Sequence, residues 1–374
     1  MIAFAGDEDT GAEDKRSYMD SITHIVLGAT IGEAMLGRRL GKKAMLVGAL
    51  AQSLPDIDFI ASSWMDTSRD VWAHRGITHS LLFVVCVAPM LAFAARRVFR
   101  GWRVAGVREP AIGGREAAKE GPLSMKAWCL FFGFQLLVHI VLDAFNAYGT
   151  GWFEPFSQYR LSFHVLFVAD PFYSVWLGIA FLGLLILKKD NRVRRRFWVR
   201  FGLILSSLYL GYCIANKFSI DARVRKELQR QQIAYTRYFT TPTPLNSWLW
   251  YIVAEDQNGF HTGYLSVFDR KPEIEFEYFP RNDSLLDPFR RHEDVQNLLR
   301  FSQGYYTVDR WEDRLVFNDL RFGQMKGWED ARAGFVFHYF LEQPGDNMVI
   351  VQRGRFAGWD ARTIGAFVRR IKGN

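Results

Sequence analysis

Hydrophobic residues are concentrated in the first part of this chain, whereas polar positions prevail after about Phe218. Four long and nearly uncharged stretches, rich in Leu, Phe, Val and Ala, cover residues 81–95, 127–145, 172–187 and 197–215. Each approaches the ~20 residues with which a helix crosses a bilayer. A soluble protein with long buried helices is the alternative, but the uneven distribution of apolar residues favours a membrane domain.

Two shorter apolar stretches, residues 25–37 and 44–54, precede these four and carry Gly and Ala at close spacing. Small residues allow helices to pack tightly in a membrane. We expect the two stretches to form a helical hairpin that either crosses the membrane at a tilt or re-enters it. The predicted fold therefore begins with an acidic tail (residues 1–19) and an α-helical polytopic membrane domain (residues 20–217) of about six helices, the first two short.

Basic residues predict how these helices are oriented. Three connections hold 19 basic and 4 acidic residues in total; they are residues 38–43, 96–126 and 188–200. Because loops rich in Lys and Arg stay on the cytoplasmic side, all three connections are predicted to be cytoplasmic. The N-terminus, residues 55–80, residues 148–170 and the chain after Asn216 then lie on the opposite side of the membrane.

After a charged linker helix (residues 218–241), the sequence changes to short runs of aromatic and β-branched residues that alternate with polar ones. Such runs predict strands. The predicted strands are residues 248–253, 263–268, 314–320 and 335–341, and the predicted helices are residues 293–301 and 362–371. Residues 242–374, called the tail domain below, are thus expected to form a small, mostly antiparallel α+β domain outside the membrane.

Net charge and cysteine content exclude two classes of function. The formal net charge is +8, but most of the excess lies in the three basic connections, so no nucleic-acid partner is expected. Cys86, Cys129 and Cys213 lie inside predicted spans without paired spacing. They predict neither a disulfide framework nor a Cys-based metal site. Nothing in the sequence indicates an oligomeric state.

The candidate chemistry lies in imidazole and carboxylate groups at the ends of the apolar segments. His139 and Asp143 are four residues apart on a predicted helix, so both side chains project from one face, as two ligands of one ion would. An intramembrane His and Asp are costly when they face lipid, and they should therefore face a polar interior. The alternative is a structural hydrogen bond between helices.

Other polar motifs lie on the same side of the membrane by the charge argument. Asp56 and Asp58 follow Pro55, which prevents simple helical continuation and leaves two carboxylates on a turn. One carboxylate can ligate a metal while the other bridges to a second ion or takes a proton from water. His24 lies near Asp20 at the start of the first predicted helix, so this apolar segment also begins with polar residues.

The sequence HRGITHS at residues 74–80 is the most specific of these motifs. Gly76 permits a backbone reversal that would bring His74 and His79 to one point. Arg75 supplies a planar cation suited to a phosphate or carboxylate of a substrate. Thr78 is expected to cap the following helix.

Together these residues resemble the YdjM-type inner-membrane metal-dependent hydrolases, which belong with the zinc-dependent phospholipase C and single-strand nuclease superfamily. The resemblance is closest over residues 18–150, and its motifs are Asp20 with Thr23-His24, Pro55-Asp56-x-Asp58, His74-Arg75-Gly76-x-Thr78-His79-Ser80, and His139-x-x-x-Asp143 followed by Tyr148-Gly149-Thr150. In the soluble relatives, three zinc ions held by His and Asp or Glu hydrolyse phosphate esters. This chain has fewer His residues and no second His-x-x-x-Glu pair, so we expect one or two ions.

The resemblance implies a multi-pass protein of the bacterial inner (cytoplasmic) membrane, with the site and the tail domain on the periplasmic side. We expect a phospholipid or another lipid-linked phosphate to reach the site by lateral diffusion and to be hydrolysed through a metal-activated water. Asp56 would bridge ions or activate the water, and Arg75 would hold the phosphate. A divalent metal, zinc in the first place, is the expected cofactor. The expected metal-site residues are Asp58, His79, His139 and Asp143, with His24 and His74 holding a second ion or orienting the other ligands.

Two other functions remain open from the sequence. A non-catalytic scaffold would use the same residues to hold a structural metal, with the tail domain as a partner-binding module, and it would show a closed coordination shell. A transporter would use intramembrane His and Asp as a proton or metal path. Only His139 and Asp143 lie well inside a predicted span, so the transporter ranks last.

Overall fold

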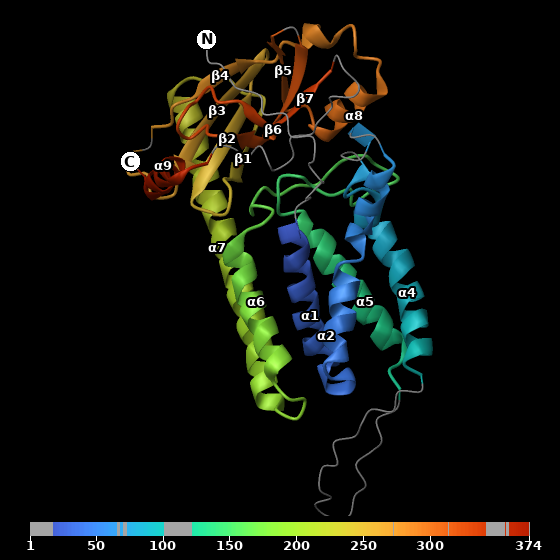
Figure 1. The fold of residues 1–374 in the computed structure, drawn as a ribbon. Coiled ribbons are helices and arrows are strands. Elements are labelled where there is room, and N and C mark those ends of the chain that lie inside the picture. Colours follow the sequence, from blue (N-terminus) through green and yellow to red (C-terminus); the bar gives the residue numbers. More distant parts are fainter. Residues whose placement is uncertain are drawn as a thin grey trace, which may run out of the picture.

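The computed structural model describes residues 18–65, 68–69, 73–100, 122–271, 273–312, 314–341, 356 and 359–373. A bundle of helices comes first, and a strand-rich domain lies at one end of it (Figure 1). This order agrees with the prediction of a helical part followed by an antiparallel α+β part. The predicted acidic tail, up to residue 17, and residues 101–121 of the second basic connection lie outside the described residues.

The described elements of the bundle are α1 (Tyr18–Leu40), α2 (Lys43–Gln52), η1 (Pro55–Ser63), η2 (Ile77–His79), α4 (Leu81–Val98), α5 (Met125–Asp143), α6 (Pro171–Ile186) and α7 (Arg192–Arg230), where η denotes a 3₁₀ helix. In the part of the chain that the structure describes, α4, α5 and α7 are long and apolar enough to cross a membrane. The apolar α6 has 16 residues and is shorter.

Helix α1 is longer than the sequence predicts. We expected the first two helices to be short, but α1 runs for 23 residues, whereas α2 has 10. The polar residues before Ile25 include neither Gly nor Pro from Tyr18 onward, so nothing there breaks the helix. At the other end, Arg38 and Arg39 lie in the last turn, where a cation complements the helix dipole.

Glycines bring α1 and α2 into backbone contact. A Cβ atom built on Gly48 would lie 2.1 Å from the carbonyl oxygen of Gly28, and one built on Gly32 would lie 2.1 Å from the carbonyl oxygen of Ala44. Only Gly fits at such an approach. Gln135 of α5 closes the same junction, because its side-chain amide donates to Gly28 O at 3.0 Å. The predicted hairpin therefore exists, and it packs against α5.

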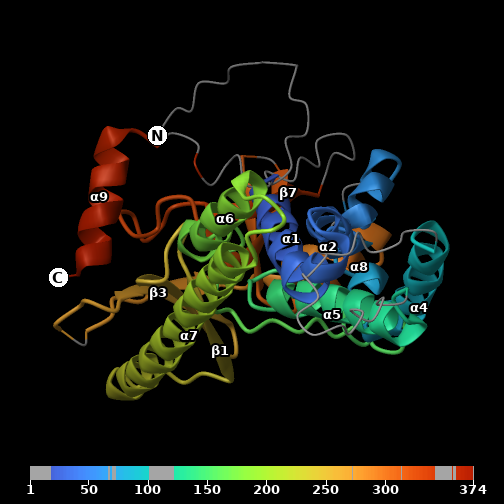
Figure 2. The same cartoon turned by 90° about the horizontal axis from the view of Figure 1, so that it is seen from below.

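The described ends of the three basic connections lie at the same end of the bundle. The α1–α2 turn, the C-terminal end of α4 with the start of α5, and the α6–α7 turn all lie at the end opposite the tail domain (Figure 1). Seen from that end, α1 lies between the α6–α7 pair and the group formed by α2 and α5 (Figure 2). A buried ion pair joins α1 to α7, with Arg195 Nε 2.7 Å from Glu33 Oε1.

Helix α7 connects the two parts of the molecule without a break. Its 39 residues correspond to about 58 Å, roughly twice the thickness of a bilayer core. The charged stretch that we expected as a linker helix is therefore the C-terminal end of this span. There Ile220, Val224 and Leu228 are buried in one hydrophobic cluster with strand residues of the tail domain such as Trp250.

The tail domain consists of two antiparallel sheets, of order β1-β2-β3-β4 and β5-β6-β7. Its elements are β1 (Arg237–Pro242), β2 (Leu249–Glu255), β3 (Gly259–Ser266), β4 (Glu277–Pro280), η3 (Asp283–Leu286), α8 (Glu293–Phe301), β5 (Tyr306–Trp311), β6 (Arg314–Gln324), β7 (Phe335–Phe340) and α9 (Ala361–Lys372). The four predicted strands and both helices are present. Strands β1, β4 and β5 were not predicted, and β1 begins at Arg237, a few residues before the predicted start of the tail domain.

We expect Gly48→Ala to lower the free energy of unfolding by about 1–3 kcal/mol, because its new methyl group would force α1 and α2 apart. Gly178→Ala in α6 is the matched control, since a Cβ there meets nothing within 4 Å. Thermal or denaturant unfolding in detergent measures both. Equal stability of the two variants would contradict the close approach of α1 and α2.

Candidate metal site

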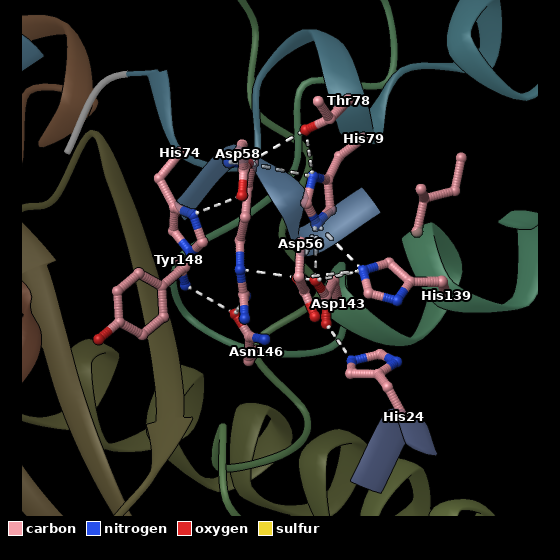
Figure 3. A network of polar contacts seen from close by, with 12 residues as sticks. His24, Asp56, Asp58, His74, Thr78, His79, His139, Asp143, Asn146 and Tyr148 are labelled. Atoms are coloured by element: carbon pink, nitrogen blue, oxygen red, sulfur yellow. Dashed lines mark hydrogen bonds and ion pairs between the residues drawn. The ribbon is translucent and has the colours of Figure 1, made fainter. Parts of the chain in front are cut away.

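Four side chains that can bind a metal converge at the end of the bundle that faces the tail domain. Asp56 comes from η1, His79 from η2, and His139 and Asp143 from the C-terminal end of α5. One ligand atom of each lies within 4.8 Å of the others. Figure 3 shows the four side chains pointing toward one another. Three polar motifs that are distant in the sequence therefore meet at one point.

The distances from the two imidazoles to each other and to the two carboxylates fit a tetrahedral ion. The Nε2 atoms of His79 and His139 face each other at 3.1 Å. Asp56 Oδ1 lies 3.5 Å from Nε2 of His79 and 3.4 Å from Nε2 of His139. Asp143 Oδ2 lies 3.1 Å and 3.5 Å from the same two atoms. Metal bonds of ~2.0–2.1 Å to zinc give a tetrahedron with edges of about 3.3–3.4 Å, so the donor set present fits such an ion.

Three of the four side chains are shielded from solvent, and Asp56 is the most exposed of the set. The side chains of His79 and His139 are fully buried and that of Asp143 is 1% exposed, whereas that of Asp56 is 19% exposed. Burial raises the pKa of Asp56, but the charge of His139 and hydrogen bonds with His139 and His79 lower it well below its ordinary value. Asp56 is therefore an ionised carboxylate at the opening of the site.

Asp58 is placed beside this group rather than in it. Its Oδ1 lies 3.2 Å from His74 Nδ1, and its Oδ2 accepts hydrogen bonds from the Arg75 N–H at 2.9 Å and the Thr78 hydroxyl at 3.1 Å. Burial raises the pKa of Asp58, but the hydrogen bond and charge of His74 and the Arg75 N–H lower it to about 2. Asp58 is thus an ionised acceptor that fixes the chain between η1 and η2.

Thr78 connects Asp58 to His79. The Thr78 hydroxyl lies 3.0 Å from His79 Nδ1. Since its single proton is donated to Asp58, the hydroxyl oxygen accepts a hydrogen bond from Nδ1–H of His79. This tautomer leaves the lone pair of Nε2 directed at His139 and the two carboxylates, as a metal ligand requires. The expectation that Thr78 caps the next helix is wrong, because Ser80 accepts from Phe83 N at 3.0 Å and caps α4.

His24 and His74 occupy different positions relative to the four side chains. His24 Nε2 lies 3.0 Å from Asp143 Oδ1, and its ring centroid is 3.9 Å from that of His139. Asp143 thus directs one oxygen to His24 and the other to His79. His74 is 36% exposed and contacts Asp58. His24 therefore contacts the candidate ligand Asp143 directly. His74 contacts Asp58, which lies beside the four converging side chains.

Arg75 lies on the other side of Asp143. Its Nε is 3.5 Å from Asp143 Oδ2, and its Nη1 donates to Asn146 Oδ1 at 2.9 Å. Arg75 has a φ of 60°, a left-handed conformation that costs a non-glycine residue roughly 1–2 kcal/mol. Its N–H is held by Asp58, and its carbonyl accepts from Gly151 N at 2.9 Å. Backbone strain held in this way is typical of functional sites.

The backbone reversal in this motif occurs at Arg75, not at Gly76 as predicted. Gly76 has a negative φ of −85°. Glycine is needed there because a Cβ atom would lie 2.8 Å from Glu154 Oε2 and 2.9 Å from Ala73 O. The centroids of the His74 and His79 rings are 6.3 Å apart, so the reversal brings the two rings near each other without bringing both to one ion.

Three residues near the site have no role in the sequence prediction. Asn146 accepts from Arg75, and Tyr148 lies under the guanidinium of Arg75, whose Cζ is 5.1 Å from the ring centroid. Arg160 is buried and donates from Nη1 to His74 O at 2.7 Å. Tyr148 belongs to a motif noted in the sequence. Asn146 and Arg160 follow apolar or loop residues, and no spacing singles them out.

The fold and the site define a helical membrane protein with a buried His and Asp cluster of metal-binding geometry. The family described as "YdjM inner membrane protein" matches residues 19–220, more than half of the chain. This chain therefore belongs to the YdjM inner membrane protein family, as the sequence motifs predicted.

Two curated proteins are similar to this chain. Inner membrane protein YbcI of Escherichia coli (strain K12) is 29% identical over 141 residues, which are 37% of this chain and 69% of that protein. Uncharacterized protein YfhP of Bacillus subtilis (strain 168) is 25% identical over 335 residues, which are 81% of this chain and 87% of that protein. No solved structure matches the chain significantly. Neither name describes an activity.

Thr78→Val should weaken zinc binding about 10–100-fold, because the imidazole of His79 would lose the partner that fixes its tautomer. The measurement is competition for zinc with a chelator of known affinity, using detergent-purified protein. Thr30→Val is the matched control, since Thr30 is buried in α1 and bonds only within that helix, to Val26 O. Unchanged zinc affinity of the Thr78 variant would contradict the assignment of this hydrogen bond.

Proposed function

We propose that this chain is a membrane-bound, metal-dependent phosphoesterase that hydrolyses a phospholipid or another lipid-linked phosphate. The observation that carries this proposal is the convergence of donor atoms of Asp56, His79, His139 and Asp143 within 4.8 Å of one another beside the buried Arg75. Zinc is the proposed metal. The resemblance to the zinc-dependent phospholipase C superfamily supports this choice, as does the donor set of imidazoles and carboxylates.

The composition of the site favours catalysis over a structural role. Structural zinc sites are usually built from Cys with or without His, whereas His with carboxylate is typical of catalytic sites. Four protein ligands would fill a tetrahedral shell, and this feature favours the second candidate function, a metal-stapled scaffold. However, Asp56 is a partly exposed carboxylate on a short 3₁₀ helix. Among the four candidate ligands, Asp56 is therefore the one best placed to share its coordination position on the metal with an incoming water.

The residues around the ion would divide the chemistry among them. A bound zinc ion would lower the pKa of a coordinated water and polarise a phosphoryl oxygen. Asp56, at the opening, would take the proton of the attacking water. Arg75 would pair with the phosphate oxygens through its planar N–H groups. Asp58 would hold Arg75 and, through Thr78, His79 in place. His24 would orient Asp143 or hold a second ion.

Apolar side chains around the opening support a lipid substrate. Exposed large apolar residues of η1, of η2 and of the turn that follows Trp152 include Ile57, Phe59, Ile60, Ile77, Phe153 and Phe156. These segments are adjacent, because η1 contacts η2, and Leu81 N donates to Trp152 O at 2.9 Å. Such residues are at home at a membrane interface. A lipid could thus bring its phosphate to Asp56 without leaving the bilayer.

The positions of the basic connections support a periplasmic site. In the part of the chain that the structure describes, all three begin and end at the end of the bundle away from the tail domain (Figure 1), whereas the candidate metal site lies at the end that faces it. By the positive-inside rule that end is cytoplasmic. The proposed enzyme therefore works on the outer leaflet of the inner membrane, and the tail domain is periplasmic.

Wild-type protein purified in detergent should contain about one zinc ion per chain or more and hydrolyse phospholipids in mixed micelles. His139→Ala and Asp56→Asn should lose most of the zinc and at least a hundredfold in rate, on the order of an effect on an essential group. His292→Ala is the matched control, because His292 is exposed at the start of α8. Mass spectrometry of metals and phosphate release measure these effects.

Two results would contradict the proposal in different ways. Folded wild-type protein that cannot be loaded with zinc would remove the metal site altogether. Zinc that is bound by the wild type and lost in His139→Ala, without hydrolysis of any phospholipid tested and with unfolding on chelation, would instead identify a structural staple.

A further inference from the structure

The tail domain contacts both interhelical segments that carry site residues, namely the connection between α2 and α4 and the connection that follows α5. Near residues 68–69, Ser68 donates to the Asp294 carboxylate of α8, and Arg69 forms a bidentate ion pair with Glu293. After α5, Tyr148 packs against the core of β5, β6, β7 and α8. The tail domain therefore contacts the helical part next to the site.

Tyr148 stands between the tail domain and Arg75. One side of its ring faces Arg75, with Cζ 5.1 Å from the centroid, within the range of a cation–π interaction. Its ring centroid lies 4.6 Å from that of Phe322 and 6.0 Å from that of Phe337. Those two rings stack on each other at 4.0 Å. An unbroken series of ring contacts thus joins the tail domain to Arg75.

Strand β6 is irregular at the place where it meets Tyr148. The pairing of β6 with β7 shifts between Asp319 and Gln324, so Phe322 lies within a bulge. Bulges re-aim side chains and are frequent beside functional sites. Arg321 locks the bulge, because it forms a buried ion pair with Asp319 and its Cζ lies 5.1 Å from the centroid of the Phe322 ring.

The main chain beside Tyr148 is tied to Arg75 as well. Asn146 Oδ1 accepts from Tyr148 N at 3.0 Å and from Arg75 Nη1 at 2.9 Å. The guanidinium of Arg75 is therefore bounded by an amide oxygen at one edge, the Asp143 carboxylate near Nε, and the Tyr148 ring on one face. These contacts define a single orientation for a long and otherwise flexible side chain.

We infer that Tyr148 is a positioning residue, pressed onto Arg75 by Phe322 and Phe337, and that the tail domain in this way completes the phosphate-binding side of the site. This inference rests on the proposed function, in which Arg75 binds the phosphate group. A planar guanidinium pairs with two phosphate oxygens only in one plane. Without the ring at its face, Arg75 would turn toward the carboxylate of Asp143, and its donors would be lost to the phosphate.

The test is the affinity of the detergent-purified full chain for radiolabelled inorganic phosphate, measured with zinc and after chelation. Tyr148→Leu removes the aromatic face and should weaken phosphate binding about tenfold. Tyr148→Phe keeps the ring and should restore the wild-type affinity. Zinc content should be the same in all three proteins, because the ring of Tyr148 acts on Arg75 and the substitution leaves the four converging side chains unchanged. A residue that only stabilises the fold would not show this pattern.

A second pair of variants tests the role of the tail domain. Phe322→Leu should weaken phosphate binding in the same way as Tyr148→Leu, since it removes the ring that presses on Tyr148. Phe317→Leu is the matched control: Phe317 is fully buried in the same core, stacks on Tyr306 and makes an edge contact with Tyr339. It should lower the stability of the tail domain but leave the phosphate affinity unchanged.

The possible failures are distinguishable. Equal phosphate affinity of wild type and Tyr148→Leu, or no phosphate binding by the wild type in either state, would overturn the inference. Weakening by Phe317→Leu as strong as that by Phe322→Leu would overturn it too, because the effect would then follow domain stability. Failure of the proposed metal site would appear instead as wild-type protein that holds no zinc, whatever residue stands at position 148.

Discussion

The carboxylate of Asp143 is the interaction on which the rest of the site depends. Its two oxygens lie near three imidazoles and one guanidinium. The imidazoles are those of His24 in α1, His79 in η2 and His139 in α5 itself, and the guanidinium is that of Arg75, two residues before η2. A buried carboxylate is costly unless it is paired and hydrogen-bonded. This one is 1% exposed, so the segments that pair with it must stay together. The same contacts that satisfy Asp143 therefore place His79 and His139 at the distances a metal requires, and Asp56 lies 3.5 Å and 3.4 Å from the Nε2 atoms of these two imidazoles.

Other features of the fold serve this convergence. The glycine contact between α1 and α2 fixes the position from which η1 starts, and η1 carries Asp56. The 39-residue α7 carries the tail domain back over the same end of the bundle. The tail domain then covers the chain after α5, which reaches Arg75 through Tyr148. The helical part matches the YdjM family, while the match to YfhP covers 81% of the chain and so extends into the tail domain.

The sequence was sufficient to predict those features of the structure whose pattern lies within a few neighbouring residues. The spacing of His139 and Asp143, the apolar segments and the strand runs of the tail domain each depend on neighbours within a few residues, and these elements are present in the structure. The meeting of Asp56 and His79 with α5 was also predicted, because charges in the loops placed their motifs at one membrane face. The periplasmic side, the metal and the activity that follow from this reasoning stay predictions.

The sequence was insufficient where contacts between distant residues decide the outcome. Asp58 was predicted as a ligand and Asp56 as the bridging or water-activating group, but Asp56 lies among the four converging side chains, whereas Oδ2 of Asp58 accepts hydrogen bonds from the backbone of Arg75 and the hydroxyl of Thr78. Gly76 looked like the reversal point, yet it is needed for the close approach of Glu154. Tyr148 acquires its surroundings from strands that follow it by more than 170 residues. No pattern within a short window records such contacts.

The central claim is that the four converging side chains hold one metal ion between them. X-ray absorption at the zinc edge of the purified, zinc-loaded protein tests this claim most directly, because it reports the atoms bound to the ion. The account predicts four to five nitrogen and oxygen neighbours at about 2.0–2.1 Å, with the outer-shell scattering of about two imidazoles and no sulfur. A sulfur neighbour at about 2.3 Å, or a spectrum without imidazole scattering, would contradict it.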